Sequence, residues 1–151
     1  MIIEDKIEPY FQPIQDTETG EIFKYEVLAR GVLDDRIIAP IFFIPPAEKL
    51  GLITSITRIM INKSFEFFQD KTHKFSINIT ERDLLENYLV DFLNEKMRIY
   101  NIAPSRVTFE ILENITLVKN NGKIAEQLNI LREMGFKIAI DDFGIENSNF
   151  S

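Results

Sequence analysis

Polar and apolar side chains alternate with two different periods along the chain, and each period predicts one kind of secondary structure. Alternation at every second position, bounded by turn residues, predicts β-strands. The predicted strands cover residues 7–14, 22–28, 75–79, 107–112 and 136–140. The first two flank the turn-forming sequence Asp-Thr-Glu-Thr-Gly and therefore predict a β-hairpin. Pro9 and Pro13 favour an edge position for the first strand, because proline has no N–H to donate to a neighbouring strand.

Apolar positions three and four residues apart predict helices between the later strands. The predicted helices cover residues 54–68, 80–100 and 123–134, with a short helix over 47–50. Pro45 and Pro46 are predicted to start the short helix, Thr80 to cap the second long one and Gly135 to end the last. Residues 32–40 are predicted to be irregular.

The order of these segments is a hairpin followed three times by a helix and a strand. Strands that are separated by helices of this length predict βαβ units and a parallel sheet. The chain contains no low-complexity linker and no repeat typical of helical arrays, so residues 1–151 are predicted to form one unit of the α/β class.

Oxygen-bearing side chains lie near the carboxyl ends of the predicted strands. These residues are Glu26, Asn78, Glu110, Asp141 and Asp142, and the last three strand ends are spaced about 30 residues apart, as in βαβ repeats. Parallel strands joined in this way end on the same side of the sheet, where α/β barrels carry their active sites. We therefore expect these side chains to converge at one rim. Taken singly, each carboxylate is more often a helix cap or a solvated surface charge.

Composition narrows the chemistry that such a rim can support. The chain has 24 acidic and 17 basic residues, a net charge of -7, no cysteine and one histidine, His73. An acidic surface repels a phosphate backbone, so bulk nucleic-acid binding is not expected. Disulfides, thiol nucleophiles and His-rich or Cys-rich metal sites are excluded. Converging carboxylates and an amide instead predict a hard divalent cation, Mg²⁺ or Mn²⁺ before Ca²⁺.

Hydropathy gives no sign of a membrane or secretory segment. Apolar residues make up 45% of the chain, but no apolar run approaches the length of a membrane span, about 20 residues. The first residues lack the basic and then apolar pattern of a signal peptide. We therefore expect a cytoplasmic protein.

Six segments of the chain resemble, in order, the motifs of the EAL domain of cyclic di-GMP phosphodiesterases. They cover residues 10–14, 26–30, 43–53, 76–80, 109–113 and 141–144. Glu26-Val27-Leu28 corresponds to the Glu-Ala-Leu signature, with valine in place of alanine. The resemblance implies a TIM-like (β/α) barrel of the EAL type, of which this chain would form the N-terminal portion. It also implies metal-dependent hydrolysis of cyclic di-GMP to the linear dinucleotide.

The resemblance also implies roles for individual residues. Glu26, Asn78, Glu110 and Asp141 would hold one Mg²⁺ or Mn²⁺ ion, and Asp141 and Asp142 would contact a second. Three residues would contact cyclic di-GMP: Gln12, Leu28 and Arg30, with Arg30 on a phosphate. Glu113 would anchor the loop that follows Asp142. Taken alone, Arg30 is more often a surface ion pair.

The chain departs from the EAL pattern in two respects. Residues 145–149 read Ile-Glu-Asn-Ser-Asn where the family usually has Thr-Gly-Tyr-Ser-Ser. The catalytic Lys and the later acidic ligands of the family have no counterpart in these 151 residues, and a closed barrel takes about 250. We therefore expect a partial barrel of about five strands, the first pair antiparallel, truncated before closure. No catalytic residue beyond the metal ligands is expected, and the chain itself is predicted to be inactive.

Two alternatives to an active phosphodiesterase follow from these departures. A degenerate EAL domain can act as a receptor for cyclic di-GMP without hydrolysing it, or as a protein-interaction and dimerisation module. An open barrel also exposes sheet edges and apolar helix faces, which are sites of association. We therefore expect a homo-oligomer that forms through the exposed barrel edges.

Overall fold

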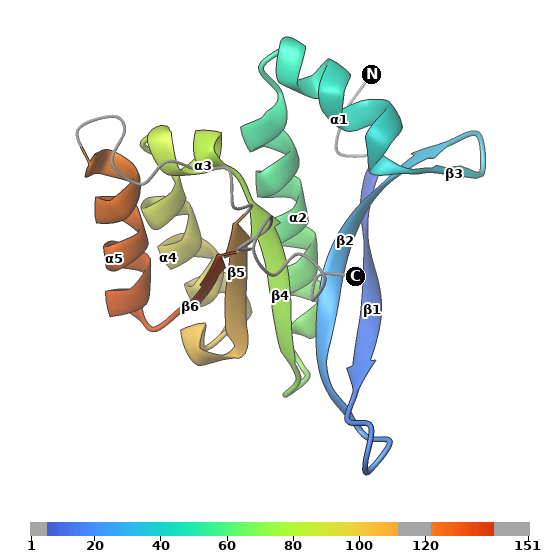
Figure 1. Cartoon of the computed structure of the whole chain (residues 1–151), viewed down its shortest axis with the longest axis vertical. Helices are drawn as coiled ribbons and strands as arrows, with labels where there is room; N and C mark the ends of the chain where they lie inside the picture. The colour runs from blue at the N-terminus through green and yellow to red at the C-terminus, as the bar shows by residue number, and fades with distance from the viewer. Residues whose placement is uncertain (1–5, 112–121, 141–151) are drawn as a thin grey trace.

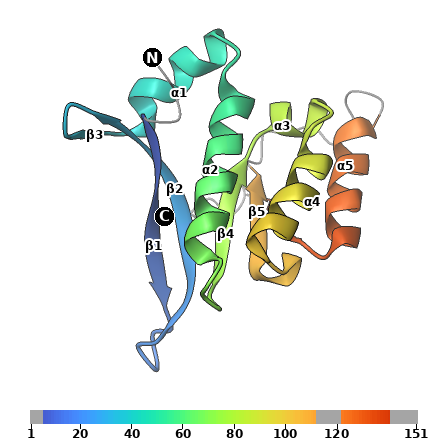
Figure 2. The same cartoon turned by 180° about the vertical axis from the view of Figure 1, so that it is seen from behind.

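The computed structural model describes residues 6–111 and 122–140, which form one sheet with helices on one of its faces (Figures 1 and 2). The strands are β1 (Ile7–Gln15), β2 (Ile22–Leu33), β3 (Arg36–Ile38), β4 (Lys74–Ile79), β5 (Val107–Ile111) and β6 (Lys137–Ile140). The helices are α1 (Pro40–Lys49), α2 (Ile53–Phe68), α3 (Glu81–Leu85), α4 (Leu89–Tyr100) and α5 (Lys123–Met134). A 3-10 turn, Pro104–Arg106, leads into β5.

The strands follow one another across the sheet in the order β1-β2-β4-β5-β6, and β3 pairs with β2 to one side. β1 is antiparallel to β2, whereas β2, β4, β5 and β6 run parallel. In the part of the chain that the structure describes, β1 and β6 form the two ends of the sheet, so the barrel is not closed. The predicted partial α/β barrel with an antiparallel first pair is confirmed, with six strands rather than about five.

The apolar face of the sheet packs against the helices and holds the core. Phe75, Ile77 and Phe109 are fully buried on this face. From α2, Phe68 stacks on Phe75 with ring centroids 4.3 Å apart, and Phe65 meets the same ring edge-on. Burying one such side chain contributes about 1.5–3 kcal/mol, so α2 is held to the sheet mainly by these rings.

The other face of the sheet carries the alternate, more polar positions. In the parallel ladders Glu26 lies opposite Ser76, Ser76 opposite Thr108, and Asn78 opposite Glu110. Residues opposite one another in adjacent strands point to the same side. In Figures 1 and 2 the described helices lie on the apolar side of the sheet, which leaves this polar face without a helical cover.

Two helix predictions differ from the structure. The short helix expected over 47–50 extends back to Pro40, which occupies the first helical turn, where no N–H partner is needed. Pro45 and Pro46 lie inside this helix, where each lacks the N–H that would donate to the preceding turn, and Ala47 after them is buried. The segment predicted to be irregular instead contains the end of β2 and the whole of β3, joined at Asp34 and Asp35, both with positive φ.

The single helix expected over 80–100 is divided into α3 and α4. Glu86 is extended at the break, with ψ of 142°. Leu84 and Leu89 lie five positions apart and would point in different directions from a continuous helix, yet both are fully buried. The break allows both side chains to enter the core. The predictions for α2, α5, β4 and β5 agree with the structure to within one residue at each described end.

In the described residues, no helix combines the length and the hydropathy that crossing a membrane requires.

Candidate functional site

A pocket of about 460 Å³ lies at the carboxyl ends of β2 and β4. The ladder between these strands ends at Val27 opposite Ile77, after which the two strands separate. Side chains from α1 and α2 border the gap, among them Ile44, Thr57 and Met60. The pocket therefore exists because β2 continues to Leu33 along β1 and β3, after it has left β4.

Five of the residues predicted from the sequence line this pocket. They are Glu26, Leu28 and Arg30 from β2, Asn78 from β4 and Glu110 from β5. They reach it from three strands, as expected for residues at the carboxyl ends of parallel strands. The structure thus brings together side chains up to 84 positions apart in the sequence, from Glu26 to Glu110.

The other predicted residues are placed differently. Gln12 lies opposite Glu26 in the β1–β2 ladder, but it is exposed and does not line the pocket. Asp141, Asp142 and Glu113 lie outside the described residues. The last described strand, β6, ends at Ile140, directly before the predicted pair of aspartates.

The charged side chains that line the pocket are mainly acidic. They comprise Glu26, Glu48 and Glu110 and one cation, Arg30. The Arg30 guanidinium donates from Nη1 to the Ala29 carbonyl oxygen at 2.7 Å, which holds its planar head beside the strand. Like charges gathered in a partly enclosed space repel one another, so this pocket favours a cation.

The donor atoms present fit a hard divalent metal ion. Glu26, Asn78 and Glu110 offer carboxylate and amide oxygens, the ligands that Mg²⁺, Mn²⁺ and Ca²⁺ prefer. Within residues 6–111 and 122–140, no three His, Cys, Asp or Glu side chains form a metal-binding cluster by themselves. The predicted set relies on an amide, Asn78, and on Asp141, which falls outside those ranges.

A buried hydroxyl lies beside these donors. Ser76 is fully buried, and among the residues that the structure describes its Oγ has no hydrogen-bond partner. It is opposite Glu26 on one side and Thr108 on the other, two residues before Asn78. Within the described part of the chain, this buried hydroxyl costs about 1–3 kcal/mol.

One buried carboxylate next to the pocket wall was not predicted from the sequence. Asp83 is fully buried, and its carboxylate accepts hydrogen bonds from Thr57, Thr80 and Tyr88. Burial raises the pKa of Asp83, while these hydrogen bonds oppose the shift. The signal was present in the sequence: Thr80-x-x-Asp83 matches the capping-box pattern, and the structure contains that box.

Comparison with known proteins gives a consistent result over the full chain. The family model of the EAL domain matches residues 1–151. The cyclic di-GMP phosphodiesterase PdeB of Shewanella oneidensis is 33% identical over 153 residues, covering 95% of this chain and 17% of PdeB. The oxygen sensor protein DosP of Escherichia coli is 30% identical, covering 99% of this chain and 20% of DosP. The chain therefore spans about a fifth of the length of these curated relatives.

A solved structure supports the same assignment of the fold. The PaMucR phosphodiesterase, solved in complex with c-di-GMP, superposes with a TM-score of 0.82 at 25% sequence identity. The superposition covers 94% of this chain and 60% of the PaMucR chain.

Proposed function

The chain belongs to the EAL domain family, and from this premise we propose that it is the N-terminal, metal-binding and dinucleotide-binding portion of a cyclic di-GMP phosphodiesterase domain. One observation carries the proposal: a single pocket collects Glu26, Asn78 and Glu110 together with Leu28 and Arg30. A cation site and an anion-binding guanidinium in one pocket suit a phosphodiester bound through a metal ion. The names of PdeB and of the PaMucR complex support this substrate.

The metal site that we propose is made of oxygen donors. Glu26, Asn78 and Glu110 would hold Mg²⁺ or Mn²⁺, and Asp141 and Asp142 would add ligands that bring in a second ion. When bound, such ions lower the pKa of a coordinated water and neutralise charge on the phosphodiester. The protein contributes the orientation of these ligands, because each lies on a strand whose ladder fixes its direction.

The dinucleotide would be bound next to the metal ligands on β2. Arg30 lines the pocket and uses one N–H on the Ala29 carbonyl, which leaves donors on the same guanidinium for a phosphate oxygen. Leu28 lies between Glu26 and Arg30 on the same side of the strand and offers an apolar contact for a base. Gln12, opposite Glu26 at the rim, would contact the outer part of the ligand.

A second candidate function is a receptor that binds cyclic di-GMP without hydrolysing it. Among the described side chains that line the pocket, the only cation is Arg30, and there is no lysine or histidine. Arginine does not lose its proton at neutral pH, so the described pocket lacks a proton-transfer group other than its metal-binding carboxylates. We therefore expect the 151-residue chain to bind without turnover.

Calorimetry of the purified chain separates these possibilities. We expect Mn²⁺ to bind the wild type, cyclic di-GMP to bind in its presence, and Glu26→Gln to weaken Mn²⁺ binding at least tenfold. Glu95→Gln, an exposed site on α4 with the same loss of charge, is the matched control and is expected to bind as the wild type does. Chromatography of the nucleotide after incubation shows whether the linear product forms.

The possible outcomes have distinct meanings. Binding of cyclic di-GMP without formation of the linear dinucleotide supports a chain that binds this ligand but does not hydrolyse it. Metal-dependent product that Glu26→Gln abolishes supports the phosphodiesterase site and contradicts the predicted inactivity. If neither Mn²⁺ nor cyclic di-GMP binds, the proposed function is wrong.

A further inference from the structure

The carboxylate of Asp83 is enclosed by hydrogen-bond donors. Its Oδ2 accepts from the Thr57 hydroxyl at 2.8 Å, and from both the backbone N–H and the hydroxyl of Thr80 at 2.9 Å. Its Oδ1 accepts from the Tyr88 hydroxyl at 2.7 Å. Relative exposure of Asp83 is 0%, so these bonds replace all of its contact with water. A buried carboxylate is retained in a fold when its oxygens are satisfied in this way.

These donors come from three different elements. Thr57 lies in the second turn of α2, Thr80 joins β4 to α3, and Tyr88 directly precedes α4. Thr57 and Thr80 also line the pocket at the carboxyl end of β4, whereas Tyr88 does not. Asp83 therefore hydrogen-bonds both to Thr57 and Thr80 in the wall of the pocket and to Tyr88 at the start of α4.

The hydrogen bonds between Asp83 and Thr80 lie close to Asn78. Thr80 follows Asn78 by two residues, and only Ile79, which is fully buried, lies between them. Asn78 and Ile79 stay paired with Glu110 and Ile111 of β5, so Thr80 is the first residue of this segment beyond the β4–β5 ladder. Beyond Val27 opposite Ile77, β4 has lost its ladder to β2, so on that side the sheet no longer holds this part of the strand.

We infer that Asp83 is a positioning residue, which fixes the carboxyl end of β4 so that the Asn78 amide oxygen faces the acidic pocket. The inference rests on the proposed function, in which Asn78 is a metal ligand. Partners that orient metal ligands typically contribute 10–100-fold to metal affinity. The Oδ2 atom of Asp83 accepts hydrogen bonds from both Thr57 and Thr80. The positioning role depends on this oxygen atom.

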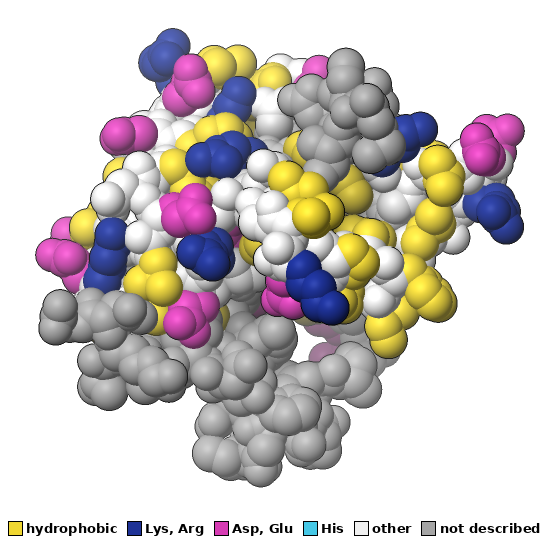
Figure 3. Space-filling model, turned by 90° about the horizontal axis from the view of Figure 1, so that it is seen from above, with side chains coloured by type: hydrophobic (Ala, Val, Ile, Leu, Met, Phe, Trp, Pro, Cys, Tyr) yellow, Lys and Arg dark blue, Asp and Glu magenta, His cyan; other side chains and the backbone are white. Residues whose placement is uncertain are grey.

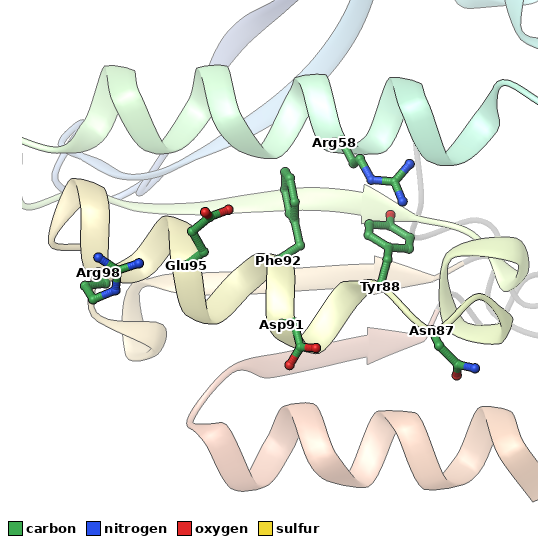
Figure 4. A pocket seen from close by; sticks show the side chains of 7 residues that line it. All are labelled: Arg58, Asn87, Tyr88, Asp91, Phe92, Glu95 and Arg98. Atoms are coloured by element: carbon green, nitrogen blue, oxygen red, sulfur yellow. The ribbon is translucent and has the colours of Figure 1, made fainter.

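Tyr88, the fourth donor to Asp83, lies towards the outer surface of the molecule. Figure 4 shows Tyr88 below Arg58 in a groove on the outer surface between α2 and α4. The Arg58 guanidinium carbon lies 4.0 Å from the centre of the Tyr88 ring, a distance typical of a cation–π contact. Tyr88 thus lines the outer groove, and its hydroxyl donates the fourth hydrogen bond to Asp83 without lining the pocket of the metal ligands.

Three variants test the positioning role. Asp83→Ala removes the acceptor for all four bonds. Asp83→Asn keeps an oxygen for Thr57 and Thr80, and its amide can donate to the Tyr88 oxygen, so this conservative change is expected to rescue the site. Asp91→Ala, on the exposed surface of α4, is the matched control for loss of a carboxylate.

The readouts are the Mn²⁺ affinity of the full chain and the NMR order parameter of the Asn78 side-chain amide without metal. We expect Asp83→Ala to weaken Mn²⁺ binding about 10–100-fold and to lower this order parameter, while Asp83→Asn and Asp91→Ala resemble the wild type. A purely structural role would lower the melting temperature and leave both readouts unchanged in the folded variant. That result would overturn the inference.

A second variant applies if Asp83→Ala does not fold. Tyr88→Phe removes one hydrogen bond outside the pocket and keeps the aromatic ring, and we expect a several-fold loss of Mn²⁺ affinity with a lower Asn78 order parameter. Wild-type values in Tyr88→Phe would then contradict the positioning role. If the wild type itself binds no Mn²⁺, the proposed function fails, whereas the order parameter still decides whether Asp83 holds Asn78.

Discussion

Two buried oxygen groups near the pocket have opposite surroundings. The Asp83 carboxylate accepts four hydrogen bonds, while the Ser76 hydroxyl has none among the residues that the structure describes. The described residues therefore satisfy the carboxylate behind Asn78. At Ser76, by contrast, a buried hydroxyl costs about 1–3 kcal/mol in this part of the chain.

The buried carboxylate predicts a dependence of stability on pH. Burial raises the pKa of Asp83 above its ordinary value of 3.8, so the folded state holds this proton more tightly than the unfolded state does. The contribution of Asp83 to stability is complete below 3.8 and is lost as the pH rises through the raised pKa. Tyr88 does not titrate in this range, because burial raises its pKa as well.

Urea unfolding of the wild type and of Asp83→Asn measures this effect. The free energy of unfolding of the wild type, relative to the variant, is expected to fall with rising pH, by at most about 1.4 kcal/mol per pH unit. A difference that stays constant with pH, or that grows, would contradict the raised pKa.

At the scale of elements, the C-terminal ends of α4 and α5 determine how each helix connects to the strand that follows it. α4 ends at Asn101 and α5 at Gly135, both in the left-handed region. After Asn101 the chain passes through the 3-10 turn Pro104–Arg106 into β5, whereas after Gly135 it enters β6 within two residues. At Gly135 the turn is also crowded, because a Cβ placed there would lie 3.2 Å from the Cβ of Pro104. Only glycine satisfies both the backbone conformation and the contact.

The chain offers a matched test of these two requirements. Gly135→Ala and Gly20→Ala both place a side chain at positive φ, but at Gly20 nothing lies within 4 Å of the added Cβ. We expect Gly20→Ala to cost about 1–2 kcal/mol, the usual penalty of the left-handed region, and Gly135→Ala to cost more. Equal losses in urea unfolding would show that Pro104 moves aside without cost.

At the scale of the whole molecule, apolar side chains are exposed beside β3, which lies to one side of the sheet. Among the described strands β3 pairs only with β2, and Ile37 on β3 is 58% exposed. Ile41 and Phe42 at the start of α1 are each 73% exposed. Figure 3 shows hydrophobic side chains gathered on the side of the molecule that carries β3. An open edge flanked by apolar side chains favours association with a second copy.

We therefore expect the chain to self-associate through β3 and α1, in line with the homo-oligomer predicted from an open barrel. Light scattering over a wide range of concentrations is expected to show a mass that rises with concentration in the wild type. Phe42→Lys is expected to reduce this rise strongly. Ile99→Lys, which adds the same charge at an exposed apolar site on α4, is the control. A monomer at all concentrations would contradict the expectation.

The local pattern of the sequence was sufficient for most of the fold. Period-two alternation identified β4 and β5 and placed Glu26, Asn78 and Glu110 near strand ends, and helical spacing gave α2 and α5 almost to the residue. It could not divide α3 from α4. Leu84 and Leu89 both match a helical pattern, and only their burial in one core requires the break between them.

The pocket itself was decided by tertiary structure. Sequence determined which side chains point away from the helices, because alternation is a property of each strand alone. Whether they meet depends on where the ladder between β2 and β4 ends, and on α1 and α2, which border the gap. For this reason Leu28 and Arg30 line the pocket with Asn78, whereas Gln12, equally well placed on its own strand, does not. The hydrogen bonds to Asp83 likewise come from Thr57, Thr80 and Tyr88, which are separated in the sequence. Only the packing of three elements around this buried carboxylate brings these donors together.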